Sequence, residues 1–177
     1  ALDLWFTRPQ GETLGVPHQR RFFTLFITAF IFLTLLSGGF VAGLKAGFSY
    51  NTFPKMGDSW IAPGILVLEP VWRNVFENAA TVQFNHRVLA ITTLILVVAL
   101  WMSSLRLPLA HRPRLGMNLL LFATLLQVTL GISTLLLHVP TALAATHQAG
   151  AVVLLSAALF LTHSLFRTPQ PMFAGKG

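Results

Sequence analysis

The sequence contains no cysteine among its 177 residues, and only five of its side chains are acidic. Without thiols, the chain has no disulfide, no thiolate metal site and no cysteine nucleophile. Charged residues make up 10% of the chain, against about 25% in a typical soluble domain. Together with a hydrophobic fraction of 54%, this scarcity of charge indicates a membrane protein.

Four apolar stretches reach or approach the roughly 20 residues that a helix needs to cross a bilayer. We expect helices at about 22–44, 79–105, 115–137 and 142–166, with a lead-in over 1–20 and a tail over 168–177. The predicted fold is an all-α membrane protein, an antiparallel four-helix transmembrane bundle over 21–167. The chain begins with Ala1 rather than methionine, so either the methionine was removed or the chain is a piece of a longer protein.

The net charge of +7 has two interpretations, nucleic-acid binding and membrane orientation. Orientation explains it better, because the basic residues concentrate at the two ends of the chain and in the 106–114 loop, whereas the 45–78 loop carries both signs. We therefore expect no nucleic-acid partner. Both termini and the 106–114 loop are predicted on the cytoplasmic or matrix side, with loop 45–78 and turn 138–140 facing outward.

Two histidines, His86 and His147, lie near the starts of the second and fourth predicted helices, which run in the same direction. A helix rises 1.5 Å per residue, so both imidazoles are roughly 8–12 Å below the outer helix ends. A lone membrane histidine is most often a core residue that hydrogen-bonds a neighbouring helix. The matched depth of this pair instead favours axial ligation of one shared porphyrin iron.

Small residues surround one of these histidines. Ala144, Gly150 and Ala151 share a helix face with His147, and they either leave room for a porphyrin edge or simply allow close helix packing. Arg87 follows the other histidine below the helix end. Its guanidinium either binds a haem propionate in bidentate fashion or extends to the membrane interface.

Glycines in the first predicted helix pose a similar choice. The run Ser37-Gly38-Gly39 is followed by Gly43, so that Gly39 and Gly43 are four residues apart. Such a pair permits close contact between helices. Alternatively, the glycines make room for a flat ligand, and the sequence favours neither interpretation.

The number of haems follows from the remaining histidines. His163 lies about 160° around its helix from His147, on the opposite face. The predicted helix 79–105 contains no second histidine. Two stacked haems need two histidines on one face of each ligand helix, so we expect one haem.

Several long motifs follow one another along the chain. They are Asn51-Thr52-Phe53-Pro54-Lys55-Met56-Gly57, Trp72-Arg73-Asn74, Phe76-Glu77-Asn78, Val82-Gln83-Phe84-Asn85-His86-Arg87, Gly131-Ile132-Ser133-Thr134-Leu135 and Ala144-Ala145-Thr146-His147-Gln148. Together they resemble the haem A synthase family and cover residues from about 20 to 166. Proteins of that family have two similar four-helix halves, each with a histidine pair. This chain resembles the second half, of the mitochondrial and proteobacterial type.

The resemblance implies a reaction and a division of labour. The family oxidises the C8 methyl group of haem O to a formyl group, giving haem A for cytochrome oxidase. The first half holds haem O and haem A as substrate and product, and the second half holds haem b, which relays electrons or is structural. Here the resemblance implies one bis-histidine haem b on His86 and His147, with Gln83 and Gln148 among the haem-binding residues.

No catalytic residue is expected in this half. In the family's first half, a glutamate stands three residues before the first ligand histidine. Gln83 occupies that position here, and a glutamine cannot accept a proton as a general base. The oxidation is therefore expected in the other half.

The resemblance also implies partners and a location. The location is a bacterial inner membrane or the mitochondrial inner membrane. The expected partners are the lipid bilayer, the N-terminal half of the same enzyme, haem O synthase, an electron donor such as a ferredoxin, and cytochrome oxidase assembly factors. Two other interpretations remain: a free-standing four-helix b-type electron-transfer cytochrome, and a membrane scaffold without a cofactor, which the histidine pair disfavours.

Overall fold

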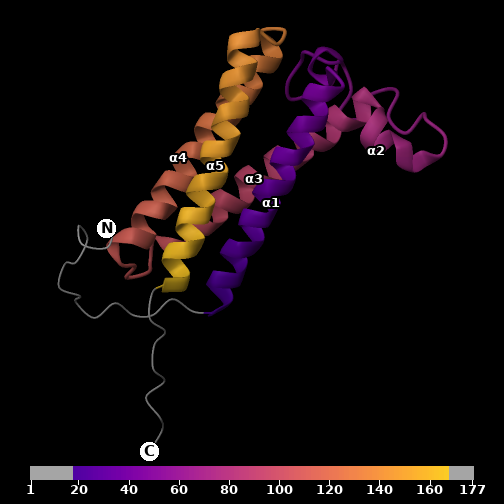
Figure 1. Cartoon of the computed structure of the whole chain (residues 1–177). Helices are drawn as coiled ribbons and strands as arrows, with labels where there is room; N and C mark the ends of the chain where they lie inside the picture. The colour runs from indigo at the N-terminus through magenta and orange to yellow at the C-terminus, as the bar shows by residue number, and fades with distance from the viewer. Residues whose placement is uncertain (1–17, 168–177) are drawn as a thin grey trace, which may run out of the picture.

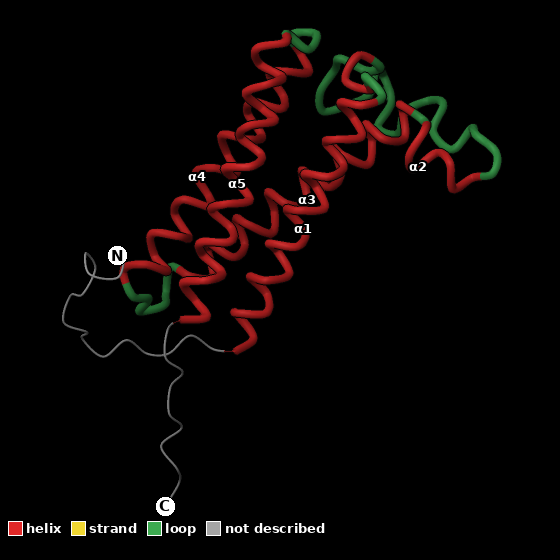
Figure 2. Tube along the Cα trace, in the orientation of Figure 1, coloured by secondary structure: helices red, strands yellow, loops and turns green. Residues whose placement is uncertain are grey.

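The computed structural model describes residues 18–167, so the predicted tail and most of the predicted lead-in lie outside the described residues. Four long helices dominate the fold (Figure 1): α1 (His18–Gly43), α3 (Ala79–Ser104), α4 (His111–Leu136) and α5 (Thr141–Arg167). Each of them is long and apolar enough to cross a membrane. Short helical turns, η2 (Ala46–Phe48), η3 (Val71–Arg73) and α2 (Asn74–Glu77), interrupt the loop between α1 and α3. Figure 2 shows only helices and loops over the described residues, which confirms the all-α prediction.

Two helices begin earlier than the apolar pattern predicts. α1 starts at His18, and its first turn is polar and basic. The helix can include these residues because long basic side chains extend from a helix end toward water. α4 starts at His111 with Pro113 in its first turn. A proline is tolerated there because the first N–H groups of a helix have no intrahelical partner.

The four long helices form a bundle in which each packs against two neighbours. α1 lies between α3 and α5, and α4 also lies between α3 and α5. α3 and α5 are therefore diagonal to each other. Since consecutive long helices are antiparallel, α3 and α5 run in the same direction, as predicted (Figure 1).

The two ends of the bundle differ in charge. We call one the basic end, where α1 begins and α5 ends; its arginines are Arg20, Arg21, Arg106, Arg112, Arg114 and Arg167. We call the other the loop end, which carries the α1–α3 loop and the turn between α4 and α5. All three acidic residues of the described range lie in the α1–α3 loop: Asp58, Glu69 and Glu77. There the guanidinium of Arg73 hydrogen-bonds Glu77 and holds the pKa of that carboxylate below its usual range.

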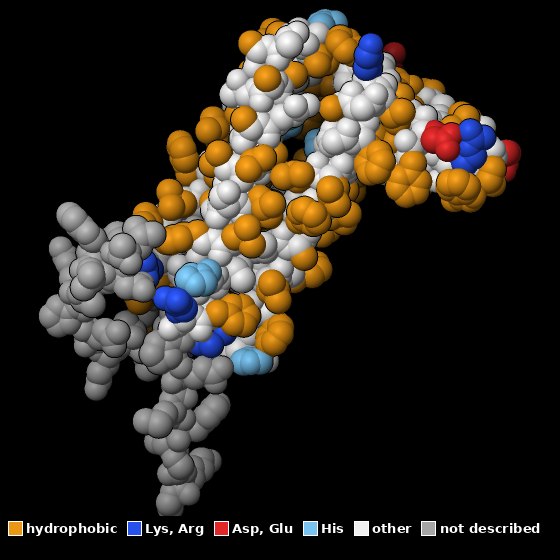
Figure 3. Space-filling view, in the orientation of Figure 1, with side chains coloured by type: hydrophobic (Ala, Val, Ile, Leu, Met, Phe, Trp, Pro, Cys, Tyr) orange, Lys and Arg blue, Asp and Glu red, His pale blue; other side chains and the backbone are white. Residues whose placement is uncertain are grey.

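The two ends also differ in packing. The buried hydrophobic core lies toward the basic end, and its members are Ile27, Ile31, Val97, Leu100, Met117, Leu120, Leu154, Ala158, Leu161 and Leu165. Gly116 lets α4 approach α5 closely there, since an added Cβ would lie 3.1 Å from the Cα of Leu161. Toward the loop end, the α1–α3 pair separates from the α4–α5 pair (Figure 1), and the space-filling view shows a hollow between them (Figure 3).

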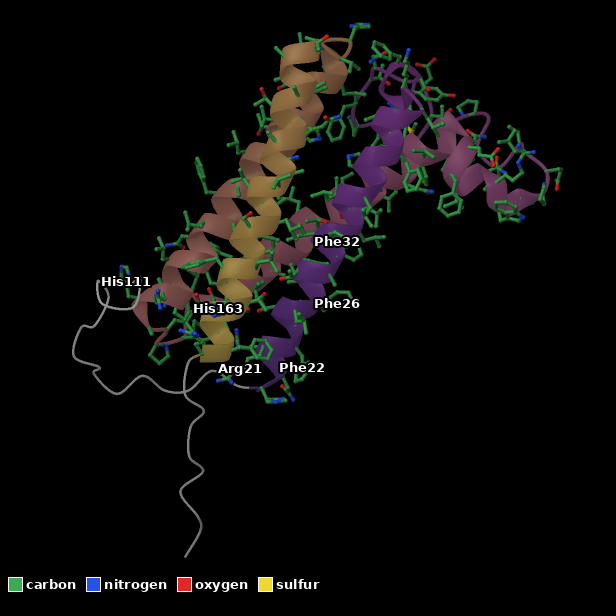
Figure 4. All side chains as sticks on the ribbon, in the orientation of Figure 1. Arg21, Phe22, Phe26, Phe32, His111 and His163 are labelled. Atoms are coloured by element: carbon green, nitrogen blue, oxygen red, sulfur yellow. The ribbon has the colours of Figure 1, made fainter. Side chains whose placement is uncertain are left out.

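The outer surface of the bundle is apolar. Phe22, Phe26 and Phe32 project from α1 away from the other helices (Figure 4), and about half of each side chain is exposed. The α1–α3 loop extends sideways at the loop end and exposes Trp60 and Trp72. Aromatic residues of this kind are typical of a membrane interface.

Candidate functional site

His86 and His147 lie at matched positions on the diagonal helices. His86 is the eighth residue of α3, and His147 is the seventh residue of α5. At 1.5 Å per residue, they lie about 10 Å and about 9 Å from the loop-end starts of their helices. Histidine side chains are visible inside the hollow between the two helix pairs (Figure 3).

The ring of His86 is held by two consecutive residues of α1. Its Nδ1 lies 2.8 Å from Oγ of Ser37, and that hydroxyl donates its own proton to the carbonyl of Thr34 at 2.7 Å. When the hydroxyl donates to Thr34, its oxygen can only accept from His86, so that Nδ1 carries the proton. This tautomer leaves Nε2 with its lone pair free. A ligand histidine is oriented in this way, since its other ring N–H donates to a fixed acceptor.

The ring of His147 is seated by α4. A Cβ added to Gly131 would lie only 2.9 Å from Cε1 of His147, so the ring occupies the space that any side chain would fill. The amide of Gln127 donates to the backbone carbonyl of His147 at 2.8 Å. Nδ1 of His147 is buried without a hydrogen-bond partner among the described residues. A buried polar nitrogen of this kind is costly unless another group satisfies it.

A glycine faces each imidazole from the neighbouring helix of the same pair. Gly38 of α1 stands to His86 as Gly131 of α4 stands to His147, with an added Cβ at Gly38 lying 3.2 Å from Cε1 of His86. By contrast, nothing lies within 4 Å of the Cβ position at Gly39 or Gly43 in the described structure. The first helix thus uses Gly38 to seat a ring, and the Gly39–Gly43 pair makes no close helix contact here.

A cavity of about 40 Å³ lies between the helices, one to two turns from the histidines toward the basic end. All four long helices line it, through Thr34, Ala90, Thr93, Thr124, Gln127, Val128 and Leu154. Ala90 follows His86 by one turn of α3, and Leu154 follows His147 by two turns of α5. A hydrogen bond of 3.0 Å between Thr34 and Thr93 joins α1 to α3 at this level. This cavity therefore lies on the basic-end side of the two histidines.

Arg87 and Gln83 contact the loop that follows α1. Arg87 donates to the backbone carbonyls of Tyr50, Thr52 and Lys55, and Gln83 donates to the carbonyl of Tyr50. The propionate contact expected for Arg87 and the haem contact expected for Gln83 therefore stay predictions, since the hydrogen bonds described here for both side chains go to the protein backbone.

The other predicted residues divide between the interior and the surface. Ala144, Gly150 and Ala151 are half-buried with His147, whereas Gln148 is exposed. At Gly150 the absent side chain makes room for Gln127 of α4, because an added Cβ would collide with Oε1 of Gln127. This is the close-packing interpretation of that glycine.

The histidines that were not expected to bind iron are exposed. His111 and His163 lie at the basic end, far from the loop end (Figure 4), and His138 lies in the turn after α4. The described residues contain no group of three or more His, Asp or Glu side chains placed to hold a bare metal ion. A porphyrin iron needs only two protein ligands, because the macrocycle supplies the other four.

The sequence interpretation gave no role to Gln127, Asn51 or Ser37. Gln127 had a detectable signal, because a lone amide in the middle of an apolar span normally faces the bundle interior with a partner. Asn51 belongs to the first resembling motif, but its partners are backbone carbonyls, which no sequence pattern identifies. Ser37 was visible only as part of a glycine-rich run.

A family model described as cytochrome oxidase assembly protein, COX15-CtaA, matches residues 2–159. The chain belongs to the COX15-CtaA family. It is 48% identical to heme A synthase COX15 of Mus musculus, over 94% of this chain and 37% of the mouse protein. It is also 52% identical to heme A synthase of Nitrosospira multiformis, over 82% of this chain and 41% of the bacterial protein.

This member of the COX15-CtaA family spans about two fifths of the length of these relatives. Human heme A synthase COX15 shows the same proportion, with 50% identity over 86% of this chain and 37% of the human protein. The resemblance inferred from the motifs is thus confirmed. No solved structure matches the chain.

Proposed function

We propose that this chain is the haem-b-binding half of a haem A synthase, the membrane enzyme that oxidises the C8 methyl group of haem O to a formyl group. His86 and His147 are the proposed axial ligands of one haem. The proposal rests chiefly on one observation: the two imidazoles sit at matched depth on diagonal, parallel helices, each against a glycine of the adjacent helix.

The residues present fit such a group. Gly38 and Gly131 keep side chains away from the two rings. Ser37 can accept from Nδ1 of His86, which leaves Nε2 of that ring for iron, and Nδ1 of His147 is buried without a partner among the described residues. The helix pairs separate toward the loop end, where a flat tetrapyrrole would enter between them (Figure 3). A bis-histidine haem accepts and donates one electron, and this is the chemistry that it would supply here.

The proposed role is electron relay or structural support rather than oxidation of the substrate. All three acidic residues of the described range lie in the α1–α3 loop, and none lies within a membrane span. Gln83 stands one turn before His86, where the resemblance places a glutamate in the other half, and its amide cannot act as a general base. The described part of the chain therefore offers no carboxylate near the histidines to accept a proton.

Orientation and partners follow from the same proposal. We infer that the basic end faces the cytoplasm or the matrix, because its six arginines are accompanied by no acid in the described range. The electrons would come from a donor such as a ferredoxin. The N-terminal half of the same enzyme would hold haem O and haem A, and haem O synthase and cytochrome oxidase assembly factors would act before and after it.

Reduced-minus-oxidised spectra of the purified protein test the ligand assignment. We expect one low-spin b-type haem per chain, which His86→Ala and His147→Ala should each abolish or convert to a high-spin spectrum. His111→Ala and His163→Ala are matched controls, since both histidines lie at the basic end and should leave the spectrum unchanged. An unchanged spectrum in His86→Ala protein would refute the assignment.

A further inference from the structure

The residues after α1 form a short segment that is tied to α3. We call residues 46–55 the strap. On the α3 side, Arg87 donates to the carbonyls of Tyr50 (2.8 Å), Thr52 (2.8 Å) and Lys55 (3.1 Å). Gln83 adds a bond of 3.1 Å to the carbonyl of Tyr50. Hydrogen bonds from a charged donor are roughly twice as strong as neutral ones, so this attachment is firm.

The same strap is tied to the opposite helix pair by one side chain. The amide nitrogen of Asn51 donates to the carbonyl of Leu135, in the last turn of α4, and to the carbonyl of Gly47, both at 2.9 Å. Carbonyls in the last turn of a helix lack the usual helical partner and accept such bonds readily. Nearby, Val139 packs against Gly47, where an added Cβ would meet its methyl group at 3.1 Å. The strap therefore reaches from α3 to α4.

The bond from Asn51 to Leu135 joins the two helix pairs at the loop end. Other side-chain bonds that join the two helix pairs lie toward the basic end: Thr28 to Thr162, Trp101 to Asn118, and Arg114 to Ser104. The hydrophobic core lies there too. At the loop end, where the pairs separate, the bond from Asn51 to Leu135 holds them together. Figure 2 shows the loop after α1 lying close to the turn between α4 and α5.

We propose that the strap closes the loop end of the haem site and that Asn51 is the residue that keeps it closed, so that retention of the bound tetrapyrrole depends on Asn51. This inference rests on the proposed haem binding. Gln83, His86 and Arg87 share one face of α3 at spacings of three and four residues. The turn that carries an iron ligand thus also anchors the strap, and opening the strap frees the space beside His86.

Haem transfer to apomyoglobin measures retention directly. The chain loaded with haem is mixed with excess apomyoglobin, and the absorbance change gives the dissociation rate. Asn51→Ala removes two hydrogen bonds, and at about 1 kcal/mol each we expect dissociation to be roughly tenfold faster or more. Asn51→Asp keeps the shape but loses the N–H donors, so it should behave like the alanine variant. The low-spin spectrum should be unchanged in both, because neither histidine is altered.

Asn118→Ala is the matched control. Asn118 accepts a bond from Trp101 across α3 and α4, but at the basic end. We expect this variant to release haem at the wild-type rate. If Asn51 were only a stabilising residue, Asn51→Ala and Asn118→Ala would speed haem release in proportion to their losses of thermal stability. That result would overturn the proposal.

A second measurement needs no haem. The chain contains no cysteine, so a single Cys introduced at Ala90, in the wall of the cavity, is a unique probe. In cofactor-free protein, Asn51→Ala should raise its labelling rate with a water-soluble maleimide several-fold, whereas Asn118→Ala should not. An equal rate in all three proteins would contradict the strap proposal. If the wild-type protein failed to bind haem, the proposed function would be refuted. The labelling rates would then still test whether Asn51 keeps the strap closed.

Discussion

The Oγ atom of Ser37 lies 2.8 Å from Nδ1 of His86, and it can accept from that nitrogen while its own proton is donated to the carbonyl of Thr34. This hydrogen bond links α1 to His86 of α3, one of the two proposed iron ligands. His147 has no equivalent, since its Nδ1 is buried without a partner among the described residues. The two proposed ligands match in depth, but only His86 has a hydrogen bond from its ring to another side chain among the described residues.

Ser37→Ala should weaken haem binding and make the haem easier to reduce. The lost acceptor lowers the basicity of His86, and removal of such a partner typically costs about 10- to 100-fold in metal affinity. A less basic ligand stabilises ferric iron less, so the midpoint potential should rise. Redox titration followed by absorbance measures this shift. Ser156→Ala, on the exposed face of α5, is the control. An unchanged potential in Ser37→Ala would show that Ser37 does not tune the ligand.

Gly131→Ala should reduce haem occupancy more than Gly38→Ala does. The added Cβ would lie 2.9 Å from the ring of His147 in the first case and 3.2 Å from the ring of His86 in the second. A contact under 3.0 Å forces the ring of His147 to move, whereas the 3.2 Å contact at Gly38 requires a smaller shift of the ring of His86. Pyridine haemochrome assays of purified variants give the occupancy. Gly39→Ala and Gly43→Ala, where the Cβ position is open, should retain full occupancy. An equal loss of haem occupancy in all four variants would show that Gly38 and Gly131 have no special role beside the two rings.

Gly150→Ala should destabilise the α4–α5 pair. The new methyl group would collide with Oε1 of Gln127 and displace the amide that donates to the carbonyl of His147. Overpacking of this kind costs about 1–3 kcal/mol. A lower thermal midpoint in detergent is the expected result, and Ala149→Ser on the exposed side is a suitable control. Combining Gly150→Ala with Gln127→Ala should restore part of the loss, because the smaller side chain removes the collision.

Cysteines introduced at Ser59 and at Ala110 should label from opposite sides of the membrane. Ser59 lies in the α1–α3 loop and Ala110 directly precedes α4, so four spanning helices place them at opposite ends of the bundle. A membrane-impermeant maleimide applied to intact cells, and then to inverted vesicles, distinguishes the two. Labelling of both from one side would refute the topology and the parallel course of α3 and α5.

Gln83→Ala in a full-length enzyme should leave much of the haem A production intact. Gln83 contributes one bond to the strap, and Arg87 contributes three more. Replacing the corresponding glutamate of the other half should remove most of the product. Haem extraction and chromatographic separation of haem O and haem A measure both variants. Loss of formyl formation in Gln83→Ala with normal haem b occupancy would place the oxidation in this half.

Apolar length and charge were enough to predict the four spans and their antiparallel order, because a bilayer requires long uncharged helices. The histidine pair could be predicted for the same reason, since a matched depth on parallel helices follows from counting residues. The roles of Arg87 and Asn51 could not. Both side chains bond to backbone carbonyls of residues more than 30 positions away, and carbonyls are the same at every residue. Helix rotation, which decides whether Gly38 or Gly39 faces a ring, also depends on packing that the sequence does not state.

The concentration of the hydrophobic core at the basic end bears on the order of assembly. That core holds the four helices together, whereas His86 and His147 lie about 10 Å and about 9 Å from the loop-end starts of α3 and α5. Because the core consists of protein side chains alone, we expect the bundle to form in the membrane before the proposed haem binds. On that expectation, haem insertion needs the α1–α3 and α4–α5 pairs to move apart only at the loop end, and the core at the basic end need not unfold.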